Sequence, residues 1–121
     1  GTVTVAVRGG PVLNDATRTD ARAAGLEEFA EIIDSGAAVP GTALASCSRT
    51  FRRRFREADL VIAKGQGNFE TLHQTAGPLF CLFRVKCEIV AAQTGHPIGS
   101  NLIWSGPGAR TKPEQSQQNV L

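Results

Sequence analysis

A lysine and two glycines follow a short apolar segment near the middle of the chain. Residues 60–63 are Leu-Val-Ile-Ala, and Lys64-Gly65-Gln66-Gly67-Asn68 come directly after them. The apolar run predicts a short buried strand. Glycine allows the backbone to turn sharply and to approach a ligand closely, and the lysine adds a positive charge. Because ligands bind at the carboxyl ends of strands in open parallel sheets, this pattern indicates a site for an anion, with phosphate as the expected one.

The KGQGN pattern differs from the two standard phosphate loops. No GxxxxGK[ST] motif is present, and Glu70 stands where the dinucleotide fingerprint requires its third glycine. A strand-to-helix turn with a solvated lysine therefore remains the alternative interpretation.

A second candidate site lies near the start of the chain. Asn14 and Asp15 follow a segment that is rich in β-branched residues, and they precede an alanine-rich segment. A carboxylate at such a strand end could bind a hard divalent cation. The alternative is a helix cap with ordinary turn chemistry. Asp34, at another predicted strand end, could support such a site or simply form a turn.

Other chemistries find little support in the sequence. There is no GxSxG elbow, and neither His73 nor His96 has a partner at ligand spacing. The arginines of 52–56 are interpreted as a solvated helix face rather than a nucleic-acid patch. Three cysteines without CxxC spacing predict buried, reduced thiols in a cytosolic protein. They are Cys47, Cys81 and Cys87.

Length and composition predict a single globular domain. The chain has 121 residues, of which 41% are hydrophobic, and a formal net charge of +2. It has no apolar run long enough for a membrane span and no signal-peptide pattern. We therefore expect neither a membrane nor a nucleic-acid partner, and the oligomeric state stays open. A chain that begins with Gly1 and enters a strand almost at once suggests a fragment, a processed product or an incomplete gene.

Strands and helices are predicted to alternate along the chain. We expect strands at 2–7, 29–34, 60–63, 79–85 and 101–104, and helices at 16–24, 46–57, 68–73 and 87–94. This alternation predicts an α/β fold with a mostly parallel sheet of about five strands and flanking helices, in a three-layer, Rossmann-like arrangement. Residues 1–104 would form the domain, and the polar residues 105–121 a disordered tail.

Several motifs, taken together and in order, resemble the C-terminal part of the damage-control phosphatases, the metal-dependent group once catalogued as domain of unknown function 89. The resemblance covers about residues 3–104. Its most specific piece is ADLVIAKGQGNFETL, from Ala58 to Leu72. It is supported by the GGPVLNDAT segment from Gly9 to Thr17, and further pieces match at Ile33–Gly36, Pro40–Thr42 and Val85–Cys87.

The resemblance implies a cytoplasmic phosphatase that acts on damaged or surplus phosphorylated metabolites such as sugar phosphates. It implies a divalent cation (manganese, cobalt, nickel or magnesium) with Asp15 as a ligand, and contact between Lys64 and the substrate phosphate. Asp15 and Lys64 would be the catalytic residues. Asn14, Gly65 and Asn68 are weaker candidates for substrate binding.

One family motif is missing from the sequence. The family's Asp-Asn pair, which supplies further metal ligands, should precede this segment, and the chain contains no Asp-Asn pair. One aspartate is a poor site for a hard cation. We therefore expect these residues alone to be inactive or nearly so. The alternatives are a non-catalytic α/β module that binds an anionic metabolite, and an inactive remnant.

Overall fold

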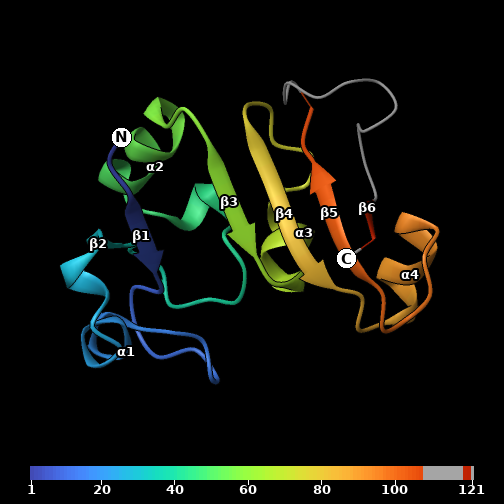
Figure 1. Ribbon diagram of the computed structural model, residues 1–121, viewed down its shortest axis with the longest axis horizontal. Coiled ribbons are helices and arrows are strands. Elements are labelled where there is room, and N and C mark those ends of the chain that lie inside the picture. The colour runs from blue at the N-terminus through green and yellow to red at the C-terminus, as the bar shows by residue number, and fades with distance from the viewer. Residues whose placement is uncertain (108–118, 121) are drawn as a thin grey trace. The chain divides into compact units, whose positions relative to one another are not determined.

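The computed structural model describes residues 1–107 and 119–120 (Figure 1). The chain divides into two compact units, Gly1–Phe55 and Arg56–Leu121. Each unit has its own sheet and is described by itself.

The first unit is built on two short parallel strands. β1 (Thr4–Val7) pairs with β2 (Glu31–Asp34), and Val7 lies opposite Asp34. Between them come α1 (Arg18–Ala23) and a 3-10 turn, η1 (Leu26–Glu28). After β2 come a second 3-10 turn, η2 (Leu44–Ser46), and α2 (Arg49–Glu57). The small core consists of Val7, Ala21 and Ile32, with Val5 and Leu26 packed against them.

The second unit contains a mixed sheet in the order β3-β4-β5-β6. Its elements are β3 (Val61–Lys64), α3 (Gln66–Leu72), β4 (Leu79–Arg84), α4 (Glu88–Thr94), β5 (Asn101–Ser105) and β6 (Asn119–Val120). β3 and β4 are parallel, whereas β5 is antiparallel to both β4 and β6. In Figure 1, α3 lies behind β3 and β4.

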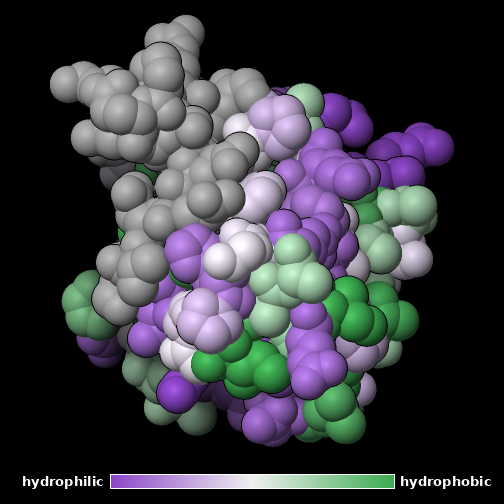
Figure 2. All heavy atoms as spheres, turned by 90° about the vertical axis from the view of Figure 1, so that its right-hand side faces the viewer, coloured by the Kyte–Doolittle hydropathy of each residue, from purple (hydrophilic) through white to green (hydrophobic). Residues whose placement is uncertain are grey.

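Phe69 of α3 is at the centre of the second core. It is fully buried, and its ring stacks on Phe83 of β4 with 4.2 Å between centroids. Trp104 of β5 meets the same ring edge-on at 5.3 Å. Figure 2 shows the face of this unit that carries α4, where hydrophilic and hydrophobic residues alternate outside the grey region.

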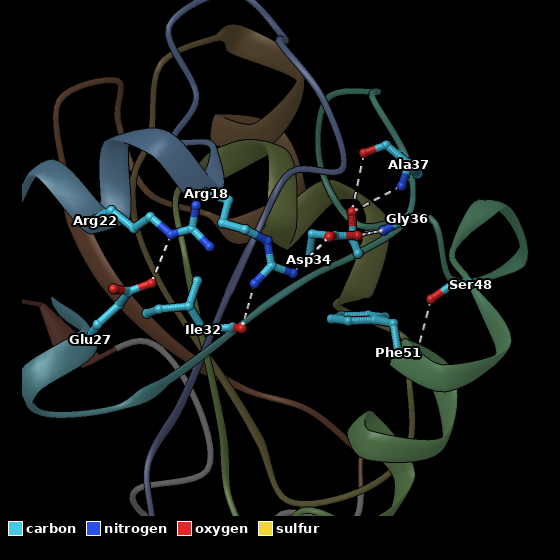
Figure 3. Close-up of polar contacts among 10 residues, drawn as sticks. Arg18, Arg22, Glu27, Ile32, Asp34, Gly36, Ala37, Ser48 and Phe51 are labelled. Atoms are coloured by element: carbon cyan, nitrogen blue, oxygen red, sulfur yellow. Dashed lines mark hydrogen bonds and ion pairs between the residues drawn. The ribbon is translucent and has the colours of Figure 1, made fainter.

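The local predictions hold for most elements. Each predicted helix and strand of 1–104 has a counterpart whose ends differ by a few residues. After Gly25 the chain forms a short 3-10 turn, and the strand that follows overlaps the one predicted at 29–34. On α2, Phe51 is buried and Arg53 is exposed, which fits the predicted two-faced helix. Ser48 begins this helix by accepting a hydrogen bond from the backbone N–H of Phe51 at 3.1 Å (Figure 3).

The predicted sheet is wrong. The described strands do not form one mostly parallel, Rossmann-like sheet of about five strands; they form a two-stranded parallel sheet and a four-stranded mixed sheet. β1 and β2 form a sheet of their own, and the mixed strand direction of the second sheet arises after β4. Asn101 of β5 pairs with Arg84, the last residue of β4, so the chain re-enters the sheet at the end it has just left. The seven residues of α4 span only about 10 Å, about half the length of a six-residue strand.

The predicted tail lies mostly outside the described residues. Ser105 completes β5, and Asn119–Val120 form β6. The predicted disordered tail covers residues 105–121, and of these 108–118 and 121 lie outside the described part of the chain.

Candidate functional site

The turn after β1 presents Asp15. The backbone N–H of Asp15 donates to Val12 O at 2.9 Å, and this turn forces Leu13 to a φ of 49°. Arg8, the residue after β1, donates from Nε to Asp15 Oδ2 at 3.0 Å. The Arg8 side chain is only 13% exposed and that of Asp15 is 40% exposed. One carboxylate oxygen of Asp15, the candidate metal ligand, is therefore already bonded to the Arg8 guanidinium group.

Arg8 also connects this turn to the loop after β2. Its Nη1 donates to Thr42 Oγ1 at 3.2 Å, and Thr42 is buried. Next to it, the backbone N–H of Gly9 donates to Ala37 O at 2.9 Å. A Cβ on Gly9 would lie 2.5 Å from Ala37 N, so a side chain cannot fit at this crossing of two main chains.

Asp34, at the end of β2, forms the second ion pair of this region (Figure 3). Arg18 donates from Nη2 to Asp34 Oδ2 at 2.9 Å and from Nη1 to Ile32 O at 2.8 Å. Hydrogen bonding from Arg18, opposed by partial burial and assisted by the N–H of Gly36, lowers the pKa of Asp34. Asp34 thus serves as the turn residue that the sequence left as one alternative, and it also anchors α1.

A cleft of about 290 Å³ opens beside these ion pairs in the first unit. Arg8, Arg18 and Asp34 contribute charged groups to it, and the remaining lining is small or hydroxylated: Gly9, Gly10, Pro11, Thr17 and Thr19. Neither Asn14 nor Asp15 lines it.

In the second unit, β3 ends at the predicted anion loop. Gly65 has a φ of 96°, a conformation that L side chains rarely adopt, and its N–H donates to Leu82 O of β4 at 2.8 Å. The Asn68 side chain donates to Lys64 O at 2.7 Å. Lys64 itself is exposed. Asn68 is thus engaged in closing the loop, and Lys64 projects its charge from a rigid strand end.

Gln66 joins this loop to the one that follows β4. Its Oε1 accepts a hydrogen bond from the backbone N–H of Lys86 at 2.7 Å. Its Nε2 lies 3.5 Å from Cys87 Sγ and 3.5 Å from Glu70 Oε1. The carboxyl-terminal ends of the two parallel strands are therefore connected through one side chain.

The two predicted catalytic residues belong to different units. Asn14 and Asp15 lie in the first unit, and Lys64, Gly65 and Asn68 lie in the second. The convergence of Asp15 and Lys64 in one cleft stays a prediction.

The donor set does not by itself fit a divalent metal. Within residues 1–107 and 119–120, no group of three or more His, Cys, Asp or Glu residues could hold an ion. Asp15 supplies one carboxylate, half of which is occupied by Arg8. A hard cation requires about six oxygen ligands, so no catalytic step through a metal follows from these residues alone.

The cysteines and His73 are explained by packing. All three cysteines are free; Cys47 and Cys81 are buried, and Cys87 is half-buried. Burial raises the pKa of Cys81 to about 11 and also raises that of Cys47, against the opposing charges of Arg8 and Arg52. His73 stacks on Phe69 and lies 2.9 Å from Gln93. The predicted burial holds for Cys47 and Cys81 but not for Cys87.

Sequence reasoning missed the residues that hold the candidates in place. Arg8 lies seven positions before its partner Asp15, and Gln66 lies 20 positions before Lys86. These spacings match no local motif. The sequence offered only indirect evidence for these contacts. Thr42 and Lys86 both lie in segments that resemble the family, but the resemblance assigns no role to either residue.

The described helices are short and polar enough that none of them could cross a membrane.

Comparison with known proteins identifies the family of this chain. The family model described as "Damage-control phosphatase ARMT1-like domain" matches residues 1–102. The chain therefore belongs to the damage-control phosphatase family, formerly DUF89, as the sequence motifs predicted.

Archaeal relatives and one solved structure place the chain within longer proteins. It is 42% identical over 99 residues to a damage-control phosphatase of Pyrococcus horikoshii, and 36% identical over 99 residues to one of Archaeoglobus fulgidus. It is 38% identical over 105 residues to an uncharacterized protein of Methanocaldococcus jannaschii. These matches cover 80–84% of this chain and 34% of each relative. The crystal structure of a DUF89 protein from P. horikoshii matches with a TM-score of 0.79 and 39% identity, over 92% of this chain and 38% of that one.

Proposed function

We propose that this chain supplies the phosphate-binding loop and one metal ligand of a metal-dependent phosphatase that acts on small phosphorylated metabolites in the cytoplasm. The observation that carries the proposal is the hydrogen-bonded KGQGN loop. It closes the end of β3 beside a parallel neighbour and leaves Lys64 exposed. Family membership supports the same chemistry, because two relatives of this chain are named damage-control phosphatases.

Lys64 would contact the substrate phosphate. A fixed ammonium group next to a phosphoryl oxygen stabilises the negative charge that develops during transfer. Gly65 and Asn68 would shape the loop for this contact, with Asn68 acting through its hydrogen bond to Lys64 O.

Asp15 would provide one ligand of a divalent cation. Arg8 holds Oδ2, and within the described residues Oδ1 accepts no hydrogen bond. Asn14 adjoins it in the same exposed turn. The remaining ligands would have to come from outside this sequence, which contains no Asp-Asn pair. The chain spans about a third of the length of its relatives, so the activity is proposed for a longer protein.

A chimera tests the proposal. Residues 1–107 would replace the matching segment of the P. horikoshii damage-control phosphatase, and hydrolysis of p-nitrophenyl phosphate would be followed with manganese, cobalt, nickel or magnesium. We expect turnover, and we expect Asp15→Asn and Lys64→Gln each to reduce kcat/KM by about a hundredfold. Arg53→Gln, an exposed change on α2, is the matched control.

Two results would count against the proposal. One is a folded chimera that does not hydrolyse the ester although the parent enzyme does, which would favour a non-catalytic binding module. The other is an active chimera that tolerates both Asp15→Asn and Lys64→Gln.

A further inference from the structure

One face of the second sheet carries a group of apolar side chains. Residues that are directly opposite each other on paired strands share a face, and so do residues two apart along one strand. Ile62 pairs with Phe80, and Leu82 pairs with Ile103. Because Phe80 and Leu82 are two apart on β4, these four side chains lie on one face, which we call the open face.

The opposite face of this sheet is covered by α3. Phe69 of α3 stacks on Phe83 and meets Trp104 edge-on. Phe83 and Trp104 alternate along their strands with the residues of the open face, so they point to the other side of the sheet. In Figure 1, α3 accordingly lies behind β3 and β4, and neither helix of this unit passes in front of these two strands.

The open face is accessible to solvent although its residues are apolar. Ile62 is 58% exposed, and Leu60, which directly precedes β3, is 55% exposed. The other three side chains of the open face are half-buried. By contrast, Cys81 on the α3 side of β4 is fully buried. In soluble proteins a contiguous exposed apolar patch of this kind marks an interaction surface.

The strand sequences have the composition of strands that are covered on both faces. A strand with one face in water alternates apolar and polar residues, whereas a strand covered on both faces is a continuous apolar run. Residues 60–63 are Leu-Val-Ile-Ala, and residues 79–83 are Leu-Phe-Cys-Leu-Phe. Both segments are continuous apolar runs, so the sequence calls for a second covering layer that the helices of this unit do not provide.

The comparisons identify a source for that layer. The matches cover 34% of each curated relative and 38% of the solved chain, so most of each of those proteins has no counterpart in this sequence. A helix suits the open face, because it satisfies its own backbone hydrogen bonds and because helices cover parallel strands. We propose that the open face is a docking surface for an amphipathic helix from the part of the phosphatase polypeptide that this sequence lacks.

Thiol labelling tests this docking surface. Ile62→Cys is introduced into the 121-residue chain and into the chimera with the P. horikoshii phosphatase. Both proteins also carry Cys87→Ser, so that the remaining native thiols of this chain are the buried ones, and each protein without Ile62→Cys is the blank. We expect the new thiol to react with an aryl disulfide at least about tenfold more slowly in the chimera, because a covered thiol reacts only when its cover opens.

Two further positions serve as matched controls. Arg53→Cys, on the exposed side of α2, should react at rates within about twofold of each other in the two proteins. Ala63→Cys, next to Ile62 but only 6% exposed, should react slowly in both. Thermal unfolding shows whether each variant is folded. Leu60→Cys, outside the ladder of β3, replaces Ile62→Cys if that variant does not fold.

The outcomes separate this inference from the proposed function. Equal labelling of Ile62→Cys in the isolated chain and in a folded chimera overturns the inference. It is also overturned if labelling of the isolated chain slows as its own concentration rises and light scattering shows a dimer, since the occupant is then a second copy. A chimera that protects Ile62→Cys but hydrolyses no ester supports the docking surface and refutes the proposed function. An active chimera without protection refutes the docking surface alone.

Discussion

Arg8 holds the carboxylate that the family resemblance assigns to metal binding. Its guanidinium group lies between Asp15 and the buried Thr42, so it fixes the direction of one oxygen and connects the turn after β1 to the loop after β2. An ion pair with one largely buried partner contributes more to the free energy of unfolding than an exposed ion pair does, because water screens it less. The sequence identifies Asp15 as a candidate ligand, but it does not predict that Arg8 connects Asp15 to Thr42. Arg8 and Thr42 are 34 positions apart, and no local pattern relates them.

A double-mutant cycle measures this contact. We expect Arg8→Met and Asp15→Asn to be coupled by about 1 kcal/mol in the free energy of unfolding, discounted because Asp15 is partly exposed. Chemical denaturation of the four proteins gives the value.

The pair Arg22–Glu27 is the matched control for that cycle. Its two side chains are 61% and 53% exposed at a similar separation of 2.8 Å. Its coupling should be no more than about 0.3 kcal/mol. Equal coupling in the two cycles would contradict a special role for Arg8.

Substitution of Gly9 tests how closely the loop after β1 crosses the loop after β2. Because a Cβ there would meet backbone atoms of Ala37 and Gly36 at 2.5 and 2.7 Å, Gly9→Ala should lower the free energy of unfolding by about 2 kcal/mol. Gly10→Ala is the control, since its Cβ would meet only the Ala38 side chain, at 3.2 Å. Thermal denaturation that ranks Gly10→Ala as the worse change would show that the crossing is not rigid.

At the scale of elements, periodicity and glycine positions predict where helices and strands occur but not how the strands pair. The strands here are four to six residues long in 4–7, 31–34, 61–64, 79–84 and 101–105. Such a strand contains no information on its direction, because an alternating side-chain pattern is the same in both directions. The antiparallel return of β5 depends on the loop just before it. There the backbone N–H of Gly99 donates to Val85 O, and the N–H of Val85 donates to Ser100 O. Only the structure shows that loop.

The attachment of α1 to β2 should depend on pH. Because the pKa of Asp34 is lowered in the folded protein, its contribution to stability is present above the unfolded value and is lost as pH falls below the ordinary value of 3.8 and through the folded pKa. We expect a difference of about 0.5 kcal/mol between wild type and Asp34→Asn at neutral pH, since the pair is partly exposed. Urea titrations should show this difference vanishing in acid. A constant difference would show that the ion pair with Arg18 is not its origin.

The packing of α3 on its sheet depends on Phe69. This side chain is fully buried against Phe83 and Trp104, so Phe69→Ala should lower the free energy of unfolding by about 3–5 kcal/mol. Phe29→Ala removes the same ring from a position that is 79% exposed and should change stability by less than about 0.5 kcal/mol. Similar losses for both variants would contradict the assigned core.

At the scale of the whole molecule, the chain contains the contacts that support the proposed phosphatase site more completely than it contains metal ligands. The end of β3 presents Lys64 in one unit, and the turn after β1 presents Asp15 in the other. Yet the match covers only 34% of each relative, and the described residues contain no cluster of three or more His, Cys, Asp or Glu residues that could hold a metal. The sequence lacks the Asp-Asn pair that the family resemblance implies, so a shortage of metal ligands is expected without coordinates.

Metal titration of the isolated chain tests that shortage directly. A hard cation needs about six oxygen ligands, whereas Asp15 offers one carboxylate that Arg8 already holds. Isothermal titration with manganese, cobalt or magnesium should therefore show no saturable binding tighter than about 1 mM, which corresponds to roughly 4 kcal/mol. Asp15→Asn should give the same heats as the wild type. Micromolar binding that Asp15→Asn abolishes would show instead that this chain builds a complete metal site, and the missing ligands would have to be sought within its own 121 residues.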